Sequence, residues 1–517
     1  MKSLLLSFAA VATLSAPLWA AEPMPPAAEL PEVPPAAGEV ASLKLEMADP
    51  KLHGPTAYLQ VLVTATMKDG TFADATRAVQ WKAEGLEISR SGVLTAKKDG
   101  TGKLQATLGG IASAEVPIAV SGTAAEFVPD YIRDVTPVIS RIGCNAGTCH
   151  GAKEGKAGFK LSLRGYDPIY DIRAFTDDIK GRRTNVASAD ESLMLLKGTA
   201  GVPHEGGQVM KQGDKYYNII RGWIAAGMKL NIDTPRVTKI ELSPSNPVVQ
   251  KIGARQQFRV LATYADGLRR DVTQESYIES GNMDIAKHDK TGLLSAARRG
   301  EAAVLARYEG AYASTVLTVM GDRTGFVWQQ PPANSPIDEL VAAKLQRMKT
   351  LPSGLCTDIE FVRRLYLDLT GLPPSPENVR AFMEDPRDSR WKREDLIDRL
   401  IASEEFNDHW TNKWCDLLQV NSKFLGGEGS KIMRDWVRAQ VKANVPYDKF
   451  VRSILTATGS NKDVPAAGYF KVLREPTETM ENTTHLFLAT RFNCNKCHDH
   501  PFERWTQDQY YQMSAWF

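Results

Sequence analysis

The sequence has few cysteines, balanced charge and no long apolar segment after its N-terminus. Its six cysteines are too few for a dense disulfide framework of the kind that holds small secreted domains together. No later segment has about 18 consecutive apolar residues, which excludes a further membrane-spanning helix. With 63 Lys and Arg against 61 Asp and Glu, no nucleic-acid or acidic-membrane partner is predicted. No Gly-x-Ser-x-Gly, His-Glu-x-x-His or phosphate-binding loop is present.

What is present is the composition of an ordinary globular protein, with 43% hydrophobic residues in 517, long enough for three or four domains. The N-terminus, MKSLLLSFAAVATLSAPLWAAEP, has a basic Lys2, an apolar run and small residues before the mature chain. This pattern predicts a signal peptide over residues 1–21; an uncleaved anchor is disfavoured by the short run and by Pro17. A Pro/Ala-rich linker follows at 22–40. We expect an exported protein, periplasmic or at the cell surface.

Two segments of about equal length repeat one β-rich pattern. QQFRVLATYADGLRRDVT (256–273) parallels AYLQVLVTATMKDGTFADAT (57–76), and short strands separated by turns predict an all-β sandwich for each copy. The copies span 41–123 and 236–321 and contain no cysteine. Trp81 and the SGVLTA turn resemble bacterial immunoglobulin-like group 2 domains. Without a titratable cluster a spacer role is favoured, and the alternative is cell-surface or polysaccharide association.

Residues 124–232, between the two copies, have a helical character. DYIRDVTPVISRIGC carries apolar residues near helical spacing and leads into the motif CNAGTCH. About 100 residues later, KYYNIIRGWIAAGM (215–228) places one aromatic-rich face on a second helix. A first helix that leads into a Cys/Cys/His motif, paired with an aromatic-bearing last helix, predicts a small, mostly α cytochrome c-like haem domain.

The motif CNKCH near the C-terminus has the spacing of covalent haem attachment. Cys494 and Cys497 would bind the two vinyl groups, and His498 would reach the iron from one face. A zinc site at 494–500 is the alternative, with His500 as a further ligand. A thioredoxin-like dithiol is disfavoured, because no strand leads into the motif and His498 would be unexplained.

The first motif departs from that spacing, with four residues between its cysteines. Cys144 and Cys149 are still expected to hold haem and His150 its iron, with a disulfide between the two thiols as the alternative. His204, in VPHEGGQVM, is the first candidate for the opposite axial ligand, and Met210 is the second. A methionine ligand would give a higher reduction potential than a histidine.

Four further residues have open roles. Arg182 and Arg183 could pair with haem propionates through charge-assisted hydrogen bonds, although an ordinary solvated pair is equally consistent. Cys356 and Cys415 are compatible with a disulfide or with two buried free thiols.

The remaining segment, 327–517, predicts a mostly α domain. Thr357 and Glu360 form a capping box at the start of one helix, which Gly371 ends. The stretch TMENTTHLFLATRFNCNKCH (479–498) predicts a long helix that runs into the second Cys/His motif.

Two parts of the sequence carry a family resemblance. The first lies within 144–208 and includes CNAGTCHGAKEGKAGFKLSLRGYDPIYD and VPHEGGQ; the second lies within 361–511 and includes FVRRLYLDLTGLPPSPENVRAFM and CNKCHDHPFERWTQDQYY. They resemble the large exported proteins of Planctomycetes and related bacteria that join a planctomycete-type cytochrome c domain to domains of unknown function. The resemblance implies c-type haem and an extracytoplasmic redox role, without an established reaction. Such proteins continue into another large domain, so we expect this chain to be incomplete after Phe517.

These observations favour one function over two alternatives. The favoured function is electron transfer by an exported multidomain c-type cytochrome with one or two haems. One alternative is a redox enzyme that acts on an extracellular polymer or its breakdown products. The other is a surface adhesion or scaffold protein with structural zinc or disulfide sites. The sequence identifies neither a substrate nor a redox partner protein.

Overall fold

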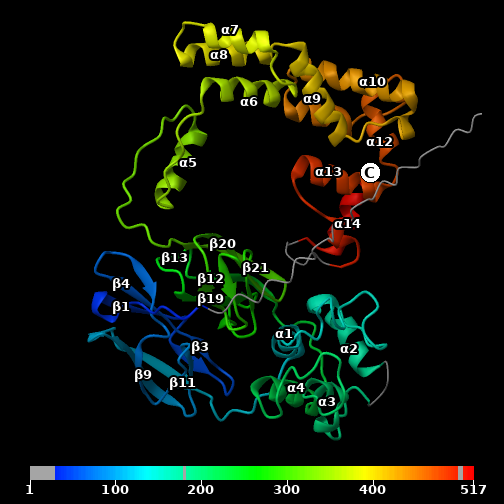
Figure 1. Cartoon of the computed structure of the whole chain (residues 1–517). Helices are drawn as coiled ribbons and strands as arrows, with labels where there is room; N and C mark the ends of the chain where they lie inside the picture. Colours follow the sequence, from blue (N-terminus) through cyan, green and yellow to red (C-terminus); the bar gives the residue numbers. More distant parts are fainter. Residues whose placement is uncertain (1–29, 178–181, 499–504) are drawn as a thin grey trace, which may run out of the picture.

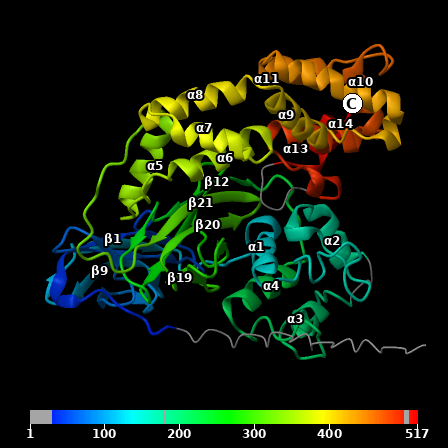
Figure 2. The ribbon, with the colours of Figure 1, turned by 45° about the horizontal axis from the view of Figure 1, so that its top comes forward.

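The computed structural model describes residues 30–177, 182–498 and 505–517, so the predicted signal peptide lies outside the described residues. Two β-sheet parts alternate with two helical parts along the chain (Figure 1). In both overall views the second β part (green) lies between the first (blue) and the smaller helical part, and the C-terminal helices lie above it (Figure 2). The predicted multidomain architecture, with N-terminal β-sandwich-like sheets and a mostly helical C-terminal region, is confirmed.

The first sandwich consists of short strands in three sheets, with orders β1-β4-β5, β10-β9-β11-β2 (β6 also pairs with β9) and β3-β8-β7. Its core includes Val61, Leu94, Leu104 and Ile118, all fully buried. After the short helical turn η1 (Ala37–Glu39), its strands are β1 (Val40–Glu46), β2 (Lys51–His53), β3 (Leu59–Gln60), β4 (Leu62–Met67), β5 (Phe72–Asp74), β6 (Gln80–Glu84), β7 (Glu87–Ile88), β8 (Val93–Thr95), β9 (Gly100–Leu108), β10 (Ile111–Ala112) and β11 (Val116–Ser121).

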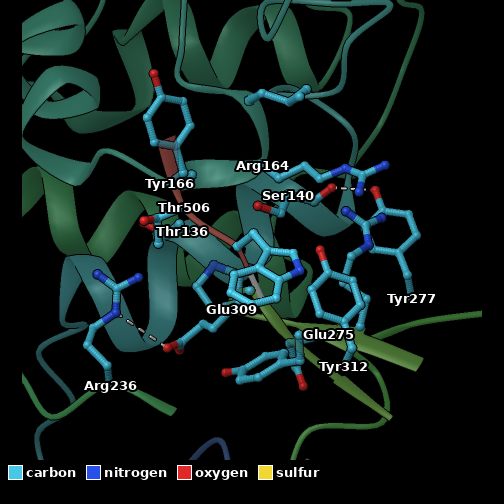
Figure 3. Close-up of a pocket in the computed structure, with 17 residues that line it drawn as sticks. Thr136, Ser140, Arg164, Tyr166, Arg236, Glu275, Tyr277, Glu309, Tyr312 and Thr506 are labelled. Carbon is cyan, nitrogen blue, oxygen red and sulfur yellow. Dashed lines mark hydrogen bonds and ion pairs between the residues drawn. The ribbon is translucent and has the colours of Figure 1, made fainter. Parts of the chain in front are cut away.

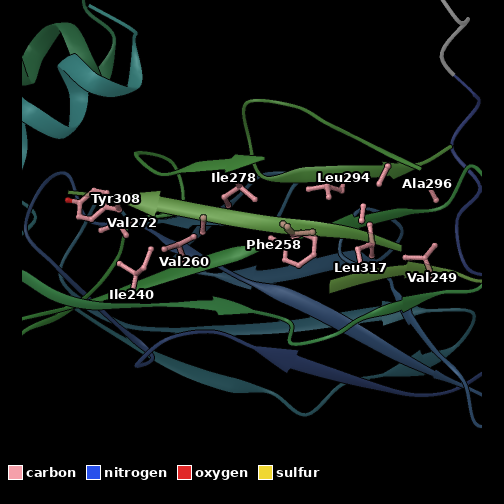
Figure 4. Close-up of a cluster of buried hydrophobic side chains, with 14 of the residues drawn as sticks. Ile240, Val249, Phe258, Val260, Val272, Ile278, Leu294, Ala296, Tyr308 and Leu317 are labelled. Carbon is pink, nitrogen blue, oxygen red and sulfur yellow. The ribbon is translucent and has the colours of Figure 1, made fainter. Parts of the chain in front are cut away.

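The second sandwich repeats this topology, with sheet orders β12-β15-β16, β13-β21-β20-β17 and β14-β19-β18. A parallel pair occurs in both copies, β2 with β11 and β13 with β21. Phe258, Val260, Leu294 and Leu317 belong to its core (Figure 4). Its strands are β12 (Val237–Ser243), β13 (Val248–Val249), β14 (Arg255–Gln257), β15 (Arg259–Tyr264), β16 (Arg269–Asp271), β17 (Tyr277–Ser280), β18 (Ala286–His288), β19 (Leu293–Ala296), β20 (Gly300–Tyr308) and β21 (Ala311–Val319).

The two sandwiches pack against each other through a reciprocal pair of buried hydrogen bonds. The Gln60 amide donates to the Asp271 carboxylate over 2.7 Å, and the Gln257 amide donates to the Asp74 carboxylate over 2.5 Å. Since equivalent residues of the two copies make equivalent contacts, the interface has an approximate twofold relationship. The copies therefore form one compact pair and are not placed end to end as in an extended stalk.

The smaller helical part lies against the second sandwich. Its first helical segment packs on α4, where the rings of Tyr131 and Trp223 are 5.0 Å apart. The predicted apolar face of α4 is buried, although Tyr217 is more deeply buried than Tyr216. Its elements are the π-helical turn η2 (Tyr131–Val135), α1 (Thr136–Arg141), η3 (Leu163–Gly165), α2 (Pro168–Thr176), η4 (Ala189–Glu191), α3 (Leu193–Gly198) and α4 (Lys215–Ala225).

The C-terminal part is helical throughout its described residues. The capping box of Thr357 and Glu360 is present, and Gly371 ends α6 with a left-handed φ of 69°. Its elements are α5 (Pro336–Arg347), α6 (Asp358–Thr370), α7 (Pro376–Glu384), α8 (Ser389–Ile401), α9 (Glu404–Leu417), α10 (Ser422–Lys442), α11 (Tyr447–Leu455), η5 (Pro465–Ala467), α12 (Gly468–Val472), α13 (Pro476–Leu488), η6 (Asn493–Lys496) and α14 (Gln507–Ser514).

The helix expected to run into the second motif ends earlier than predicted. Ala489 adopts a left-handed conformation with a φ of 53° and closes α13, after which the chain turns before η6. His485 lies on the exposed side of α13, where its Nε2 accepts a hydrogen bond from Arg491. Among the described residues, no helix combines the length and apolarity needed to cross a membrane.

Candidate functional site

The first Cys/His motif forms a series of tight turns directly after α1. The His150 amide donates to the Cys144 carbonyl over 3.0 Å, so the four inserted residues fold back and bring the histidine next to the first cysteine. A Cβ atom on Gly151 would lie 2.1 Å from the Asn145 oxygen, so only glycine fits after His150. The longer spacing between the thiols is thus accommodated within a compact loop.

His150 is oriented by the chain that follows the motif. Its Nδ1 lies 3.0 Å from the Phe159 carbonyl, and its ring lies 4.7 Å from the Phe159 ring. Because a carbonyl only accepts, Nδ1 carries the proton and Nε2 keeps its lone pair, as in most metal-ligating histidines. Burial lowers the pKa of His150, the bond to Phe159 opposes this, and the nearby His204 and Arg183 lower it further.

His204 is held in the same manner and lies within electrostatic reach of His150. Its Nδ1 lies 2.9 Å from the Gly207 carbonyl, which again leaves Nε2 with its lone pair. The ring lies over Gly206, where a Cβ would be only 2.9 Å from Cε1. His150 and His204 therefore lie in the same part of the chain, near enough for His204 to lower the pKa of His150.

Met210 lies elsewhere in the same part of the chain. Its side chain is buried in the hydrophobic core and packs on Gly198 of α3, where an added Cβ would be 3.5 Å from the sulfur. This core position gives Met210 a packing role that His204, on an exposed loop, does not have.

Arg183 is a buried structural residue, whereas Arg182 is exposed. The Arg183 guanidinium donates to the carbonyls of Ala174 and Gly158, over 2.6 and 3.1 Å, and lies 4.4 Å from the centre of the Phe159 ring. Arg183 thereby holds Phe159, the residue that orients His150. The sequence did not predict this role of Arg183.

All six cysteines are free thiols, so neither of the alternative disulfides is formed. Burial raises the pKa of the Cys144 thiol to about 12, and the nearby Cys149 adds to this shift. Cys415 is buried in α9, where burial raises its pKa to about 11, and Cys356 is partly buried. Cys144 and Cys149 therefore lie near each other as two thiols.

The second motif presents its thiols outward. Cys494 lies in η6 and Cys497 caps it, and residues three apart in such a helix lie on one side. Both thiols are exposed, and His498 is partly buried, while His500 lies outside the described residues. In the described part of the chain no three His, Cys, Asp or Glu side chains gather as ligands of one metal ion.

A buried asparagine follows the first cysteine in both motifs. Asn145 is 2% exposed, and its side-chain amide donates to Ser140 Oγ over 2.9 Å. Asn495 is fully buried, and its amide donates to the Trp505 carbonyl over 2.5 Å. Both motifs share the dipeptide Cys-Asn, and this shared dipeptide was a sequence signal for the buried asparagine. The predictions from the sequence did not use it.

A cavity of about 270 Å³ lies at the junction of three parts of the chain, lined by residues of the smaller helical part, the second sandwich and the C-terminal part (Figure 3). Arg164 lines one side, and its amide donates to the Asn145 carbonyl over 3.0 Å. Trp505 also lines the cavity, and its carbonyl accepts the bond from Asn495. Arg164 and Trp505 therefore each connect a motif to the cavity.

The residues of both motifs fit covalent haem. The first offers two neighbouring free thiols and a histidine with its Nε2 lone pair available, and a second such histidine lies close by. The second offers two exposed thiols on one side of a turn, followed directly by His498.

Comparisons with known proteins match parts of the chain. A family model described as "PSCyt2: Protein of unknown function (DUF1549)" matches residues 336–517. Ice-binding protein 1 of Shewanella frigidimarina is 28% identical over 131 residues, which make up 25% of this chain and 14% of that protein.

Solved structures of surface layer protein SbsC also match. Domains 1–6 match at 10% identity and a TM-score of 0.16, covering 56% of this chain and 29% of theirs. Domains 4 and 5 match at 11% identity and a TM-score of 0.15, covering 54% of this chain and 98% of theirs. At such TM-scores these likenesses carry no argument about the present chain.

Proposed function

We propose that the chain is an extracytoplasmic c-type cytochrome that transfers electrons and holds haem at both Cys/His motifs. The observation that carries the proposal is the environment of His150. Its Nδ1 is fixed on the Phe159 carbonyl, its Nε2 keeps a lone pair, and two free thiols precede it in one compact loop. Neutral imidazole with this anchoring is the form that ligates iron.

Each residue has a distinct role in this proposal. Cys144 and Cys149 would hold the first haem through thioether bonds, and His150 and His204 would supply nitrogen ligands to its iron. Haem supplies a one-electron ferric/ferrous couple when bound. His204 is preferred over Met210 because its Nε2 keeps a lone pair on a loop next to His150, whereas Met210 is part of the core.

At the second motif Cys494 and Cys497 would hold haem, and His498 would ligate its iron. The outward direction of both thiols supports access by a cofactor and by the machinery that attaches it. Zinc at 494–500 is the alternative occupant of this motif.

The proposed location is outside the cytoplasmic membrane, periplasmic or at the cell surface. It rests on the signal-like N-terminus and on the resemblance of both motif regions to exported proteins. Neither the N-terminal pattern nor the resemblance identifies a redox partner protein.

The test is production of the chain with haem-attachment machinery, followed by a reduced-minus-oxidised spectrum and mass spectrometry of the cysteine peptides. Haem on both 144–150 and 494–498 is expected. Haem on 494–498 alone, with 144–149 joined by a disulfide, would leave one haem. Zinc without haem would overturn the proposal. Cys494→Ala should remove one haem, whereas Cys356→Ala, the matched control outside both motifs, should remove none.

A second candidate function is a redox enzyme that acts on an extracellular polymer or its breakdown products. The observation in its favour is the cavity between Arg164 and Trp505, which borders both motif regions. Haem reduction that depends on an added substrate would favour the enzyme over a simple electron carrier.

A further inference from the structure

One buried acidic group, Glu309, lines the interdomain cavity. The side chain of Glu309 lines the cavity and is 2% exposed. Both of its carboxylate oxygens are buried and accept no hydrogen bond of normal geometry within the described structure. Arg236 is the nearest cation, with its Nε 3.9 Å away at the side of the cavity (Figure 3). The Val237 amide and Tyr308 lower the pKa of Glu309 without making a hydrogen bond of normal geometry. Because an ionised carboxylate is costly to bury, its two oxygens still lack well-placed donors.

The internal repeat has a different residue at this position in each copy. Glu309 lies in the turn between β20 and β21, and Gly109 lies at the matching turn between β9 and β10 of the first sandwich. Both positions have a left-handed backbone, with φ of 45° at Glu309 and 59° at Gly109. Glycine adopts this conformation freely, whereas a glutamate there is strained. The second copy thus has a strained, buried glutamate where the first copy has the favourable residue, which points to function at this position.

The charges around the cavity select the class of ligand. Its lining includes Arg164 and Arg307 as well as Glu275 and Glu309, so a cation or an anion would each meet like charge. The Arg307 guanidinium lies 4.3 Å from the centre of the Tyr277 ring. Mixed charge of this kind suits a neutral ligand with both donors and acceptors.

The walls of the cavity add flat apolar surface. Tyr166, Tyr277, Tyr312 and Trp505 line it, and aromatic faces pack well against the C–H faces of a ring. A volume of about 270 Å³ limits the occupant to a small molecule.

We propose that this cavity binds a neutral sugar of monosaccharide size, with the two oxygens of Glu309 accepting hydrogen bonds from two neighbouring hydroxyl groups. The aromatic walls pack against the ring of the sugar. Glu309, the residue that carries this proposal, belongs to neither Cys/His motif.

The test measures sugar binding to the full chain by saturation-transfer NMR and calorimetry. The neutral probes are D-glucose, D-galactose, D-mannose and myo-inositol, and the charged probes are D-glucosamine and D-glucuronate. At least one neutral probe should bind, and Glu309→Gln should weaken its Kd at least tenfold. Glu309→Gly should abolish binding while leaving Tm unchanged or higher, because it installs the residue of the first copy. Glu241→Gln, an exposed glutamate of the same sandwich, is the matched control and should bind normally.

Several results would overturn the proposal. Binding of only glucosamine would make the cavity a cation site, and binding of only glucuronate would make it an anion site. Absence of binding by all six probes, or binding that survives Glu309→Gly, would also refute it. A lower Tm in Glu309→Gly would show that Glu309 serves the fold through its pair with Arg236. Haem content is measured separately by spectroscopy and mass spectrometry, so failure of the proposed function would remain distinguishable.

Discussion

The backbone amide of Gln60 in the first sandwich donates a hydrogen bond over 2.7 Å to the buried carboxylate of Asp271 in the second. The same carboxylate accepts bonds from the amide and hydroxyl of Thr273, so it serves its own turn and the interface at once. Asp74 and Gln257 repeat the arrangement in the opposite direction. The backbone amides of Gln60 and Gln257 therefore join the two copies through the carboxylates of Asp271 and Asp74. Removing a carboxylate takes away the acceptor of the amide that faces it.

We expect Asp271→Ala to destabilise the pair of sandwiches by about 3 kcal/mol, because it leaves buried amide donors of both copies unpaired. The change is measured as the free energy of unfolding in urea. Asp289→Ala is the matched control, since Asp289 makes similar turn bonds to Thr291 on an exposed loop and does not cross the interface. Its cost should be about 1 kcal/mol. Equal costs in the two variants would show that the interface bond adds nothing.

The acidity of Glu309 predicts a pH dependence of stability. Burial raises its pKa from 4.5 to about 7, an effect that Arg236, the Val237 amide, Arg270 and Tyr308 only partly offset. Between these two values the folded chain holds a proton that the unfolded chain has lost. The contribution of Glu309 to stability should therefore be greatest below about pH 4.5, fall as the pH rises, and reach its full loss above about pH 7. The loss is on the order of 3 kcal/mol at most.

The variant Glu309→Gln separates the pH dependence due to Glu309 from that of other acidic residues. Burial also raises the pKa of Asp171 to about 7 and that of Asp271 to about 6, so the wild-type curve contains several contributions of the same sign. The difference between wild type and Glu309→Gln removes those contributions. It should change between pH 4.5 and 7 in favour of the variant; a difference that stays constant across that range would contradict the assignment.

Local features of the fold could be predicted from the sequence because they depend on neighbouring residues. The capping box of Thr357 and Glu360, the glycine that ends α6, and the buried face of α4 follow from residue type and spacing. The repeat of the sandwich is visible because both copies keep the same turns. The early end of α13 was not predictable, since alanine at position 489 gives no signal for a left-handed conformation.

Contacts between parts of the chain could not be predicted in this way. The sequence YEG at 308–310 is typical of an exposed turn, and Glu309 is buried by residues far away in the sequence. The assignment of Cys144, Cys149, His150 and His204 to a haem site stays a prediction. The roles of Phe159 and Arg183 in orienting His150 depend on tertiary packing that no motif records.

The thiols should differ sharply in reactivity in haem-free, reduced protein. Cys494 and Cys497 are exposed, whereas burial raises the pKa of Cys144 to about 12. Since the thiolate is the reactive form, alkylation of Cys144 by iodoacetamide at pH 8 should be about 100-fold slower or more. Mass spectrometry over a time course gives the rates for each peptide. In urea the differences should disappear, and equal rates in the folded protein would place Cys144 at the surface.

The choice between His204 and Met210 has a direct spectroscopic test in haem-loaded protein. Both side chains belong to the same part of the chain, but the His204 ring acts electrostatically on His150 while Met210 packs on Gly198. His204→Ala should remove the sixth ligand, convert that haem to a high-spin spectrum and allow carbon monoxide to bind. Met210→Leu conserves the volume of the core and should leave both the spectrum and the reduction potential unchanged.

His204→Met should restore a low-spin spectrum with a higher potential, because a thioether favours the ferrous state. The opposite pattern, with a spectral change only in Met210→Leu, would assign the ligand to Met210 and make His204 an ordinary loop residue.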